Sequence, residues 1–123
     1  MKTPFLLLLF IAFVISLSGC DKYHAKKLAG TYACRVEYHY WDMTPTTFDT
    51  TYYEDLQITQ EGKDVFVLGY RIHVENLWKE KQFKVGNIHN YLLVQFKDKH
   101  VYITRSSGGL GGNGTRTYSG KKK

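Results

Sequence analysis

The chain has 123 residues, with 17 Lys and Arg against 11 Asp and Glu, and a formal net charge of +6. This length supports one domain with a modest hydrophobic core. The basic excess is moderate and is not arranged as a stripe with aromatic platforms, so the composition excludes a dedicated nucleic-acid-binding domain.

The first segment of the chain, residues 5–17, is mostly apolar and follows a single positive charge at Lys2. A membrane-spanning helix needs about 20 predominantly apolar residues, and this run is shorter. One positive charge, a short apolar block and small residues at its end are typical of a secretory signal. The pattern therefore predicts a cleaved signal peptide over residues 1–19.

The end of that segment, Leu17-Ser18-Gly19-Cys20, resembles the lipobox of bacterial lipoproteins. The resemblance implies cleavage after Gly19, a diacylglycerol thioether on Cys20, and acylation of the new amine by a fatty acid such as palmitate. Two or more acyl chains hold a protein stably on a membrane, whereas one binds reversibly. We therefore expect a membrane-anchored protein, with an ordinary cleaved signal as the alternative.

The residue after the lipidated position is Asp21, and lipoprotein resemblance gives it two meanings. In enteric-type bacteria an Asp there resembles an inner-membrane retention signal, whereas in other Gram-negative lineages it is compatible with the outer membrane. We expect the bacterial cell envelope, with the outer membrane favoured and the inner membrane as the alternative. Residues 20–30 would form the lipidated cysteine and a short tether, as one or two helical turns or a solvated spacer.

From Thr31 onward, period-2 alternation dominates and long helical patterns are absent, which predicts strands. Over residues 31–41 the even positions, including Tyr32, Cys34 and Val36, share an apolar face. Cys34 is therefore expected to be a buried, inert thiol. The remaining strands are expected near residues 50–60, 65–75, 90–97 and 100–105, with a weaker edge strand over 77–85.

The connections are predicted from turn residues and glycines. Residues 60–64, 86–90 and 97–99 are expected to be turns, and residues 42–50 a polar loop. The Gly-rich stretch 106–115 is predicted to be a flexible loop. A β domain over residues 31–120 would then be followed by a basic tail, residues 121–123.

About seven or eight strands with short connections predict an all-β fold: a single small antiparallel meander closed into a barrel or folded as a sandwich. Gly30-Thr31-Tyr32 resembles the Gly-x-Trp that opens the first strand of the lipocalin family, with Tyr in place of Trp. The resemblance implies a lipocalin-like barrel that holds a small apolar ligand.

Catalytic and metal-binding patterns are missing from the sequence. His39 and His73 are expected on outward strand faces, and His89 and His100 in or beside turns, without the spacing of a metal site. No nucleophile elbow or phosphate-binding loop is present. We therefore expect no enzyme activity, no cofactor and no metal.

The aromatic residues are the remaining functional signal, with ten Tyr, two Trp and seven Phe. They either fill the core or line a binding face, for which Tyr40, Trp41, Tyr52 and Tyr53 are the candidates. The expected function is a non-catalytic binding module for a small ligand, glycan or protein partner. The alternative is an inhibitor or immunity-type envelope lipoprotein. "GTYAC" (30–34) resembles the early cysteine of lysozyme-inhibitor lipoproteins, but the second cysteine of that family is missing.

Overall fold

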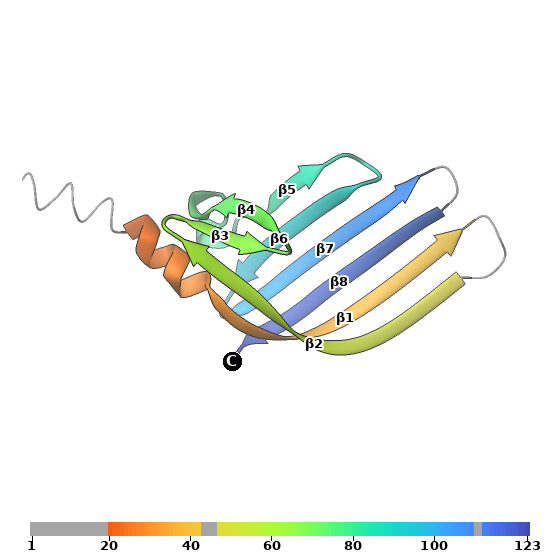
Figure 1. Cartoon of the computed structure of the whole chain (residues 1–123), viewed down its shortest axis with the longest axis horizontal. Helices are drawn as coiled ribbons and strands as arrows, with labels where there is room; N and C mark the ends of the chain where they lie inside the picture. The colour runs from red at the N-terminus through yellow and green to blue at the C-terminus, as the bar shows by residue number, and fades with distance from the viewer. Residues whose placement is uncertain (1–19, 43–46, 110–111) are drawn as a thin grey trace, which may run out of the picture.

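The computed structural model describes residues 20–42, 47–109 and 112–123, so the signal-peptide and cleavage-site predictions lie outside the described residues. Residues 20–28 form an N-terminal helix, and most of the remaining chain forms one antiparallel sheet (Figure 1). The predicted all-β, antiparallel fold is confirmed. The elements after the helix are β1 (Gly30–Asp42), β2 (Thr47–Glu61), β3 (Asp64–Val67), β4 (Tyr70–His73), η1 (Val74–Asn76), η2 (Trp78–Glu80), β5 (Phe83–Gly86), β6 (Tyr91–Lys97), β7 (His100–Gly109) and β8 (Gly112–Lys122).

The strand order in the sheet is β4-β3-β2-β1-β8-β7-β6-β5. Every strand therefore lies beside its neighbour in sequence, except that β4 and β5 do not pair and β8 pairs with β1 instead. This is the order of an up-and-down barrel left open at one seam. The two 3-10 turns η1 and η2 connect the strands on either side of that seam, and the sheet is a half-barrel.

The N-terminal helix packs its inward side on the end of the half-barrel. Ala25 is fully buried, and Leu28 packs against the core. The helix ends before Gly30, whose φ of 145° is a conformation that other residues rarely adopt. The hydroxyl of Tyr32 donates a hydrogen bond to the carbonyl oxygen of Leu28 at 2.7 Å, which ties the helix end to β1. Residues 20–30 were expected to form either one or two helical turns or a solvated spacer, and the helical alternative is correct.

The core lies on one face of the sheet, which we call the inner face and define by Tyr32, Cys34 and Val36 of β1. These side chains are at most 2% exposed, so the predicted alternation is confirmed. The remaining core side chains come from the helix, the 3-10 turns and the other strands: Ala25, Leu56, Ile58, Val65, Val67, Ile72, Val74, Leu77, Leu92, Val94, Phe96, Val101, Ile103 and Tyr118.

The predicted single strand over residues 65–75 is wrong. Leu68 and Gly69 have φ angles of 50° and 83°, and they turn the chain between β3 and β4. Two positive φ angles are what a two-residue type I′ hairpin turn requires. Val65 pairs with Ile72 across this hairpin, and both are buried. The buried positions change from odd (Val65 and Val67) to even (Ile72 and Val74) across the turn. Residues 65–68 are apolar at both parities, so the sequence shows no clear break where the buried face changes.

The predicted flexible loop at 106–115 is also wrong, because its described residues extend β7 and β8. Ser106 pairs with Thr115 and Gly109 with Gly112. β8 also pairs with β1 along the same stretch, so neighbouring strands on both sides hold the glycines in the sheet. At the other predicted loop, β1 continues to Asp42 and β2 begins at Thr47, while residues 43–46 lie outside the description.

The terminal lysines, expected as a tail, extend the sheet. Lys121 and Lys122 belong to β8, and the backbone N–H of Lys123 donates to the carbonyl of Thr31 at 2.9 Å. The ammonium of Lys123 also contacts the carboxylate of Asp55 at 2.6 Å. Among the described residues, no helix has the length and hydropathy needed to cross a membrane.

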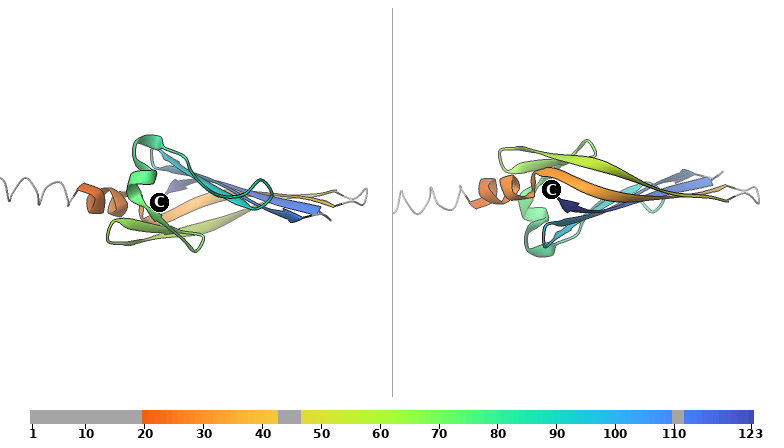
Figure 2. Two further views of the ribbon diagram at one scale, coloured as in Figure 1. Left: turned by 90° about the horizontal axis from the view of Figure 1, so that it is seen from above. Right: turned by 90° about the horizontal axis from the view of Figure 1, so that it is seen from below.

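The sheet has two different ends, visible edge-on in Figure 2. At the end beside the helix, the ribbons separate into two layers with the 3-10 turns between them. At the opposite end, the far end, β1, β2, β7 and β8 run together as a thin sheet. We refer to these regions as the helix end and the far end.

Candidate functional site

A pocket of about 550 Å³ opens at the helix end, between the N-terminal helix, η2 and the β6–β7 turn. Its apolar lining comes from four separate segments of the chain, and comprises Leu28, Tyr32, Leu77 and Phe96. Cavities of this size with mostly apolar walls are typical small-molecule sites. We call this cavity the mouth pocket.

The apolar floor of the mouth pocket is fixed by core packing. Tyr32 and Phe96 are in edge-to-face contact, with ring centroids 5.9 Å apart and planes at 62°. Leu77, between the two 3-10 turns, is only 2% exposed. Burial raises the pKa of Tyr32 to about 12, with a smaller contribution from Cys34, so its hydroxyl stays neutral and donates to Leu28. The floor is therefore rigid and uncharged.

One wall of the pocket is a stacked pair from the helix and η2. The rings of His24 and Trp78 have centroids 3.3 Å apart with planes at 35°. The Nδ1 atom of His24 is buried and has no hydrogen-bond partner among the described residues. Trp78 remains 40% exposed, so part of its indole faces the open side.

The rim of the mouth pocket is basic. Five lysines line it against two carboxylates, Glu80 and Asp98; the lysines are Lys27, Lys79, Lys97, Lys99 and Lys122. Within the described part of the chain, none of these lysines forms an ion pair, although the Lys122 ammonium donates to the carbonyl oxygen of Lys27 at 2.9 Å. A concave site lined by one sign of charge attracts ligands of the opposite sign. The rim therefore favours an anion.

Four residues of the rim have positive φ angles, a backbone conformation that is unfavourable for residues other than glycine. Lys79, Glu80, Asp98 and Lys99 all have φ between 48° and 64°. At Asp98 and Lys99 a two-residue hairpin requires this geometry. At Lys79 and Glu80 no hairpin does, and the left-handed region costs roughly 1–2 kcal/mol per residue. The side chain of Gln95 holds this turn by donating to the carbonyl oxygen of Glu80 at 2.9 Å. Backbone strain of this kind is concentrated at ligand sites.

The sequence-predicted binding residues do not line the mouth pocket and do not form one face. Tyr40 lies on the inner face at the far end, whereas its neighbour Trp41 points to the outer face and is 49% exposed. Tyr52 is half-buried on the inner face, and Tyr53 on the outer face is 78% exposed. Adjacent residues in a strand point to opposite faces, so neither pair acts together.

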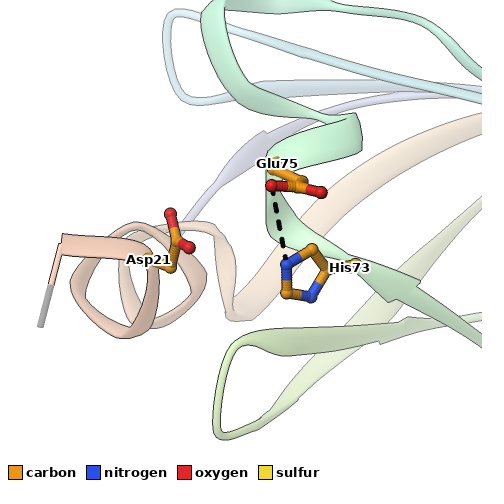
Figure 3. Close-up of side chains that lie close together, drawn as sticks. All are labelled: Asp21, His73 and Glu75. Atoms are coloured by element: carbon orange, nitrogen blue, oxygen red, sulfur yellow. Dashed lines mark ion pairs between the residues drawn. The ribbon is translucent and has the colours of Figure 1, made fainter. Parts of the chain in front are cut away.

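A group of metal-ligand type forms where the helix approaches η1, as Figure 3 shows for Asp21, His73 and Glu75. Their donor atoms lie within 4.8 Å of one another, and His73 Nε2 is 3.9 Å from Glu75 Oε2. His73 Nδ1 is hydrogen-bonded to Asp64 at 2.9 Å. Sequence spacing gave no sign of this group, because Asp21 belongs to the N-terminal helix and only the fold brings it close to His73 and Glu75. These residues could hold a divalent cation, and they connect the helix start to η1.

The groups that nucleophilic catalysis would need are kept apart or inactive. Cys34 is 2% exposed, and burial raises its thiol pKa, with Glu54 and Asp55 adding smaller effects in the same direction. A protonated, buried thiol is a poor nucleophile. His39 lies on the opposite face of β1, paired with Asp49.

The fold and pocket together define a small antiparallel half-barrel with a cavity at one end that has an apolar floor and a basic rim. Comparison of the chain with protein-family models, with curated proteins and with solved structures gives no match. The site itself therefore supplies the argument for function.

Proposed function

We propose that the protein is a bacterial envelope lipoprotein, anchored through acyl groups on Cys20, and that its mouth pocket binds a small anionic amphiphile without chemical turnover. The lipobox-like Leu17–Cys20 sequence supports the anchor and an envelope location, with the outer membrane favoured. The up-and-down half-barrel supports a lipocalin-like mode of binding. No cofactor or metal is needed for this role.

The observation that carries the ligand class is the combination of an apolar floor and a lysine rim in one cavity. An apolar tail of six CH₂ groups would contribute about 5 kcal/mol on burial, at roughly 0.8 kcal/mol each. A carboxylate or phosphate that accepts charged hydrogen bonds from the rim would add about 1.5–3 kcal/mol for each bond. After the cost of association, these contributions correspond to binding in the micromolar to millimolar range. A neutral or cationic amphiphile would lose the second contribution.

The position of the pocket is consistent with a ligand taken from the membrane interface. The described part of the helix that forms its wall extends from Cys20 over nine residues, or about 14 Å at 1.5 Å per residue. The proposed anchor therefore places the pocket close to the headgroup region. Amphiphiles that leave or enter the bilayer would meet the lysine rim at that level.

The direct test measures decanoate binding to residues 20–123 carrying Cys20→Ser, through quenching of tryptophan fluorescence. Decanol is the matched neutral ligand. We expect decanoate to bind at least about tenfold more tightly, which corresponds to 1.4 kcal/mol. Replacing Lys27 and Lys99 together by Gln should remove most of that preference.

The matched control is Lys26→Gln, because Lys26 is an exposed neighbour on the same helix and does not line the pocket. This variant should bind decanoate like the unmodified chain. Equal binding of decanoate and decanol, or equal losses in the Lys26 variant and in the Lys27/Lys99 double variant, would contradict the proposed ligand class.

A further inference from the structure

We propose that the far end carries a second binding site, for an anionic saccharide such as a chain of uronic acids. The site is a groove of about 490 Å³ on the inner face, separate from the mouth pocket. Its functional side chains come from β1, β7 and β8, and comprise Tyr38, Tyr40, Arg105, Ser107 and Arg116. We call it the arginine–tyrosine groove.

The first observation is an uncompensated pair of like charges. Arg105 and Arg116 are direct cross-strand partners in β7 and β8, and both line the groove. Like charges directly opposite each other destabilise a sheet. None of the ion pairs formed by the described residues includes either arginine. An arginine pair at this position fits a ligand that supplies the missing negative charge, because guanidinium groups bind carboxylates through two parallel hydrogen bonds.

Arg116 contacts two tyrosines of the inner face. Its guanidinium group lies over the ring of Tyr38, with 5.0 Å between the guanidinium carbon and the ring centroid, and it also interacts with the hydroxyl of Tyr118. Neither tyrosine supplies a negative charge, so the two guanidinium groups still favour an anionic ligand.

The second observation is an aromatic platform beside the arginines. The rings of Tyr38 and Tyr40 have centroids 6.5 Å apart and planes only 21° from parallel. Tyr40 is 36% exposed, and its neighbour across the strand, Phe48, is 56% exposed. Aromatic side chains left exposed on one face of a sheet offer a flat apolar surface with a polar hydroxyl at the edge. A pyranose ring presents a matching flat apolar face.

The third observation explains the Gly-rich stretch. Gly112 and Gly114 of β8 face the groove between the tyrosines and Ser107, and contribute no side chain. A Cβ atom at Gly114 would lie 3.2 Å from the Tyr38 hydroxyl oxygen, and one at Gly112 would lie 2.8 Å from the carbonyl oxygen of Trp41. Glycine therefore keeps the floor of the groove low and the tyrosine accessible.

The location of the groove favours a saccharide over a peptide. An extended peptide binds a sheet by hydrogen bonding to an unpaired edge. The groove lies over β1 and β8, which are paired on both sides, whereas the edges of the sheet are β4 and β5. The groove therefore offers side chains and not backbone groups to a ligand. A saccharide can bind such side chains through its ring hydroxyls and carboxylates.

The test uses the lipidated protein in nanodiscs of neutral phospholipid, titrated with oligogalacturonate in a calorimeter. The neutral control saccharide is maltohexaose, the peptide control is oligoglutamate, and empty nanodiscs provide the blank. We expect oligogalacturonate to bind at least tenfold more tightly than either control. Arg105→Gln and Tyr40→Ala should each weaken binding at least tenfold, and Tyr40→Phe should weaken it less.

Arg35→Gln is the matched control, because Arg35 is an exposed arginine on the outer face of the same sheet. Its affinity for oligogalacturonate should not change. Arg105→Gln should also unfold at the same or a higher temperature, since it relieves the repulsion with Arg116. The proposal is overturned by undetectable oligogalacturonate binding, by equal binding of maltohexaose, by equal binding of oligoglutamate, or by an unaffected Arg105 variant.

Discussion

The helix end and the far end of the sheet share the same strands but differ in what lies opposite their inner face. Along β1, Val36 is fully buried, whereas Tyr40, four residues farther on the same face, is 36% exposed. At the helix end, strands from both sides of the sheet and the 3-10 turns cover the inner face; at the far end nothing described covers it (Figure 2). Strand parity therefore decides the face of a side chain, and the opposing layer decides its burial.

The largest expected difference between the two ends is in packing energy. Ile103 is 1% exposed in the core, and Ile103→Ala should lower the free energy of unfolding by about 2–5 kcal/mol. Its neighbour Tyr102 on the outer face is 41% exposed, and Tyr102→Ala should cost less than about 1 kcal/mol. Urea denaturation of both variants measures the contrast. Similar losses would show that the inner face is not a packed core.

Two particular glycines, Gly120 at the helix end and Gly109 at the far end, should also respond differently to substitution. At Gly120 an added Cβ would lie 2.6 Å from the carbonyl oxygen of Ala33 and would also collide with the Cys34 sulfur. Overpacking of this kind costs roughly 1–3 kcal/mol. At Gly109, in the far end, an added Cβ meets nothing within 4 Å. Gly120→Ala should therefore destabilise the protein in thermal unfolding, while Gly109→Ala should leave its stability within about 0.5 kcal/mol.

Ionisation of Tyr32 should make the helix end sensitive to alkaline pH. Burial raises its pKa in the folded protein to about 12, from the ordinary tyrosine value of 10.0. Because the folded pKa lies above the unfolded value, this contribution to stability is fully present below pH 10 and is lost as the pH rises towards 12. Unfolding followed between pH 9 and 12 should show a steeper loss for the unmodified chain than for Tyr32→Phe. Tyr53→Phe, at an exposed tyrosine, should keep the steep loss.

The smallest effect is expected from the exposed ion pair beside η1. Hydrogen bonds from Arg71, and then from His73, lower the pKa of Asp64 below 3.8. Because the folded pKa is depressed, the contribution to stability is present above pH 3.8 and is lost as the pH falls through the lower, folded value. Asp64→Asn should therefore reduce the acid-induced fall in unfolding temperature between pH 4 and 2. Asp49→Asn, at the far end, should change it less.

The sequence was sufficient to predict the fold class, because alternation and turn chemistry act locally. The parity of β1, the burial of Cys34 and the turns at 86–90 and 97–99 followed directly from those signals. The hairpin at Leu68-Gly69 was missed because Leu is an unusual residue for a positive φ, and because the apolar run over residues 65–68 hides the change of buried parity at the turn. The strand at 106–109 was missed because glycine has little strand propensity of its own. Pairing with neighbours on both sides overrides that preference.

The candidate sites were much harder to predict than the fold. The mouth pocket combines the N-terminal helix, η2 and the β6–β7 turn, which lie far apart in the chain. Only the strand parity of Tyr32 pointed to its floor. At the far end, strand parity was enough to predict that Tyr40 shares a face with Tyr38 and not with Trp41. The arginines could not be predicted in this way, because they come from β7 and β8. The register between distant strands had to be known first.

Because β1 is long, the far end lies a considerable distance from the proposed anchor at Cys20. From Gly30 to Tyr40 the strand advances ten residues, or about 33 Å at 3.3 Å per residue. This distance exceeds the thickness of a headgroup layer, which is roughly 5–8 Å on each side of the hydrocarbon core. With the acyl groups on Cys20 and the sheet standing upright, the arginine–tyrosine groove would sample material well outside the bilayer. The mouth pocket would remain at its surface.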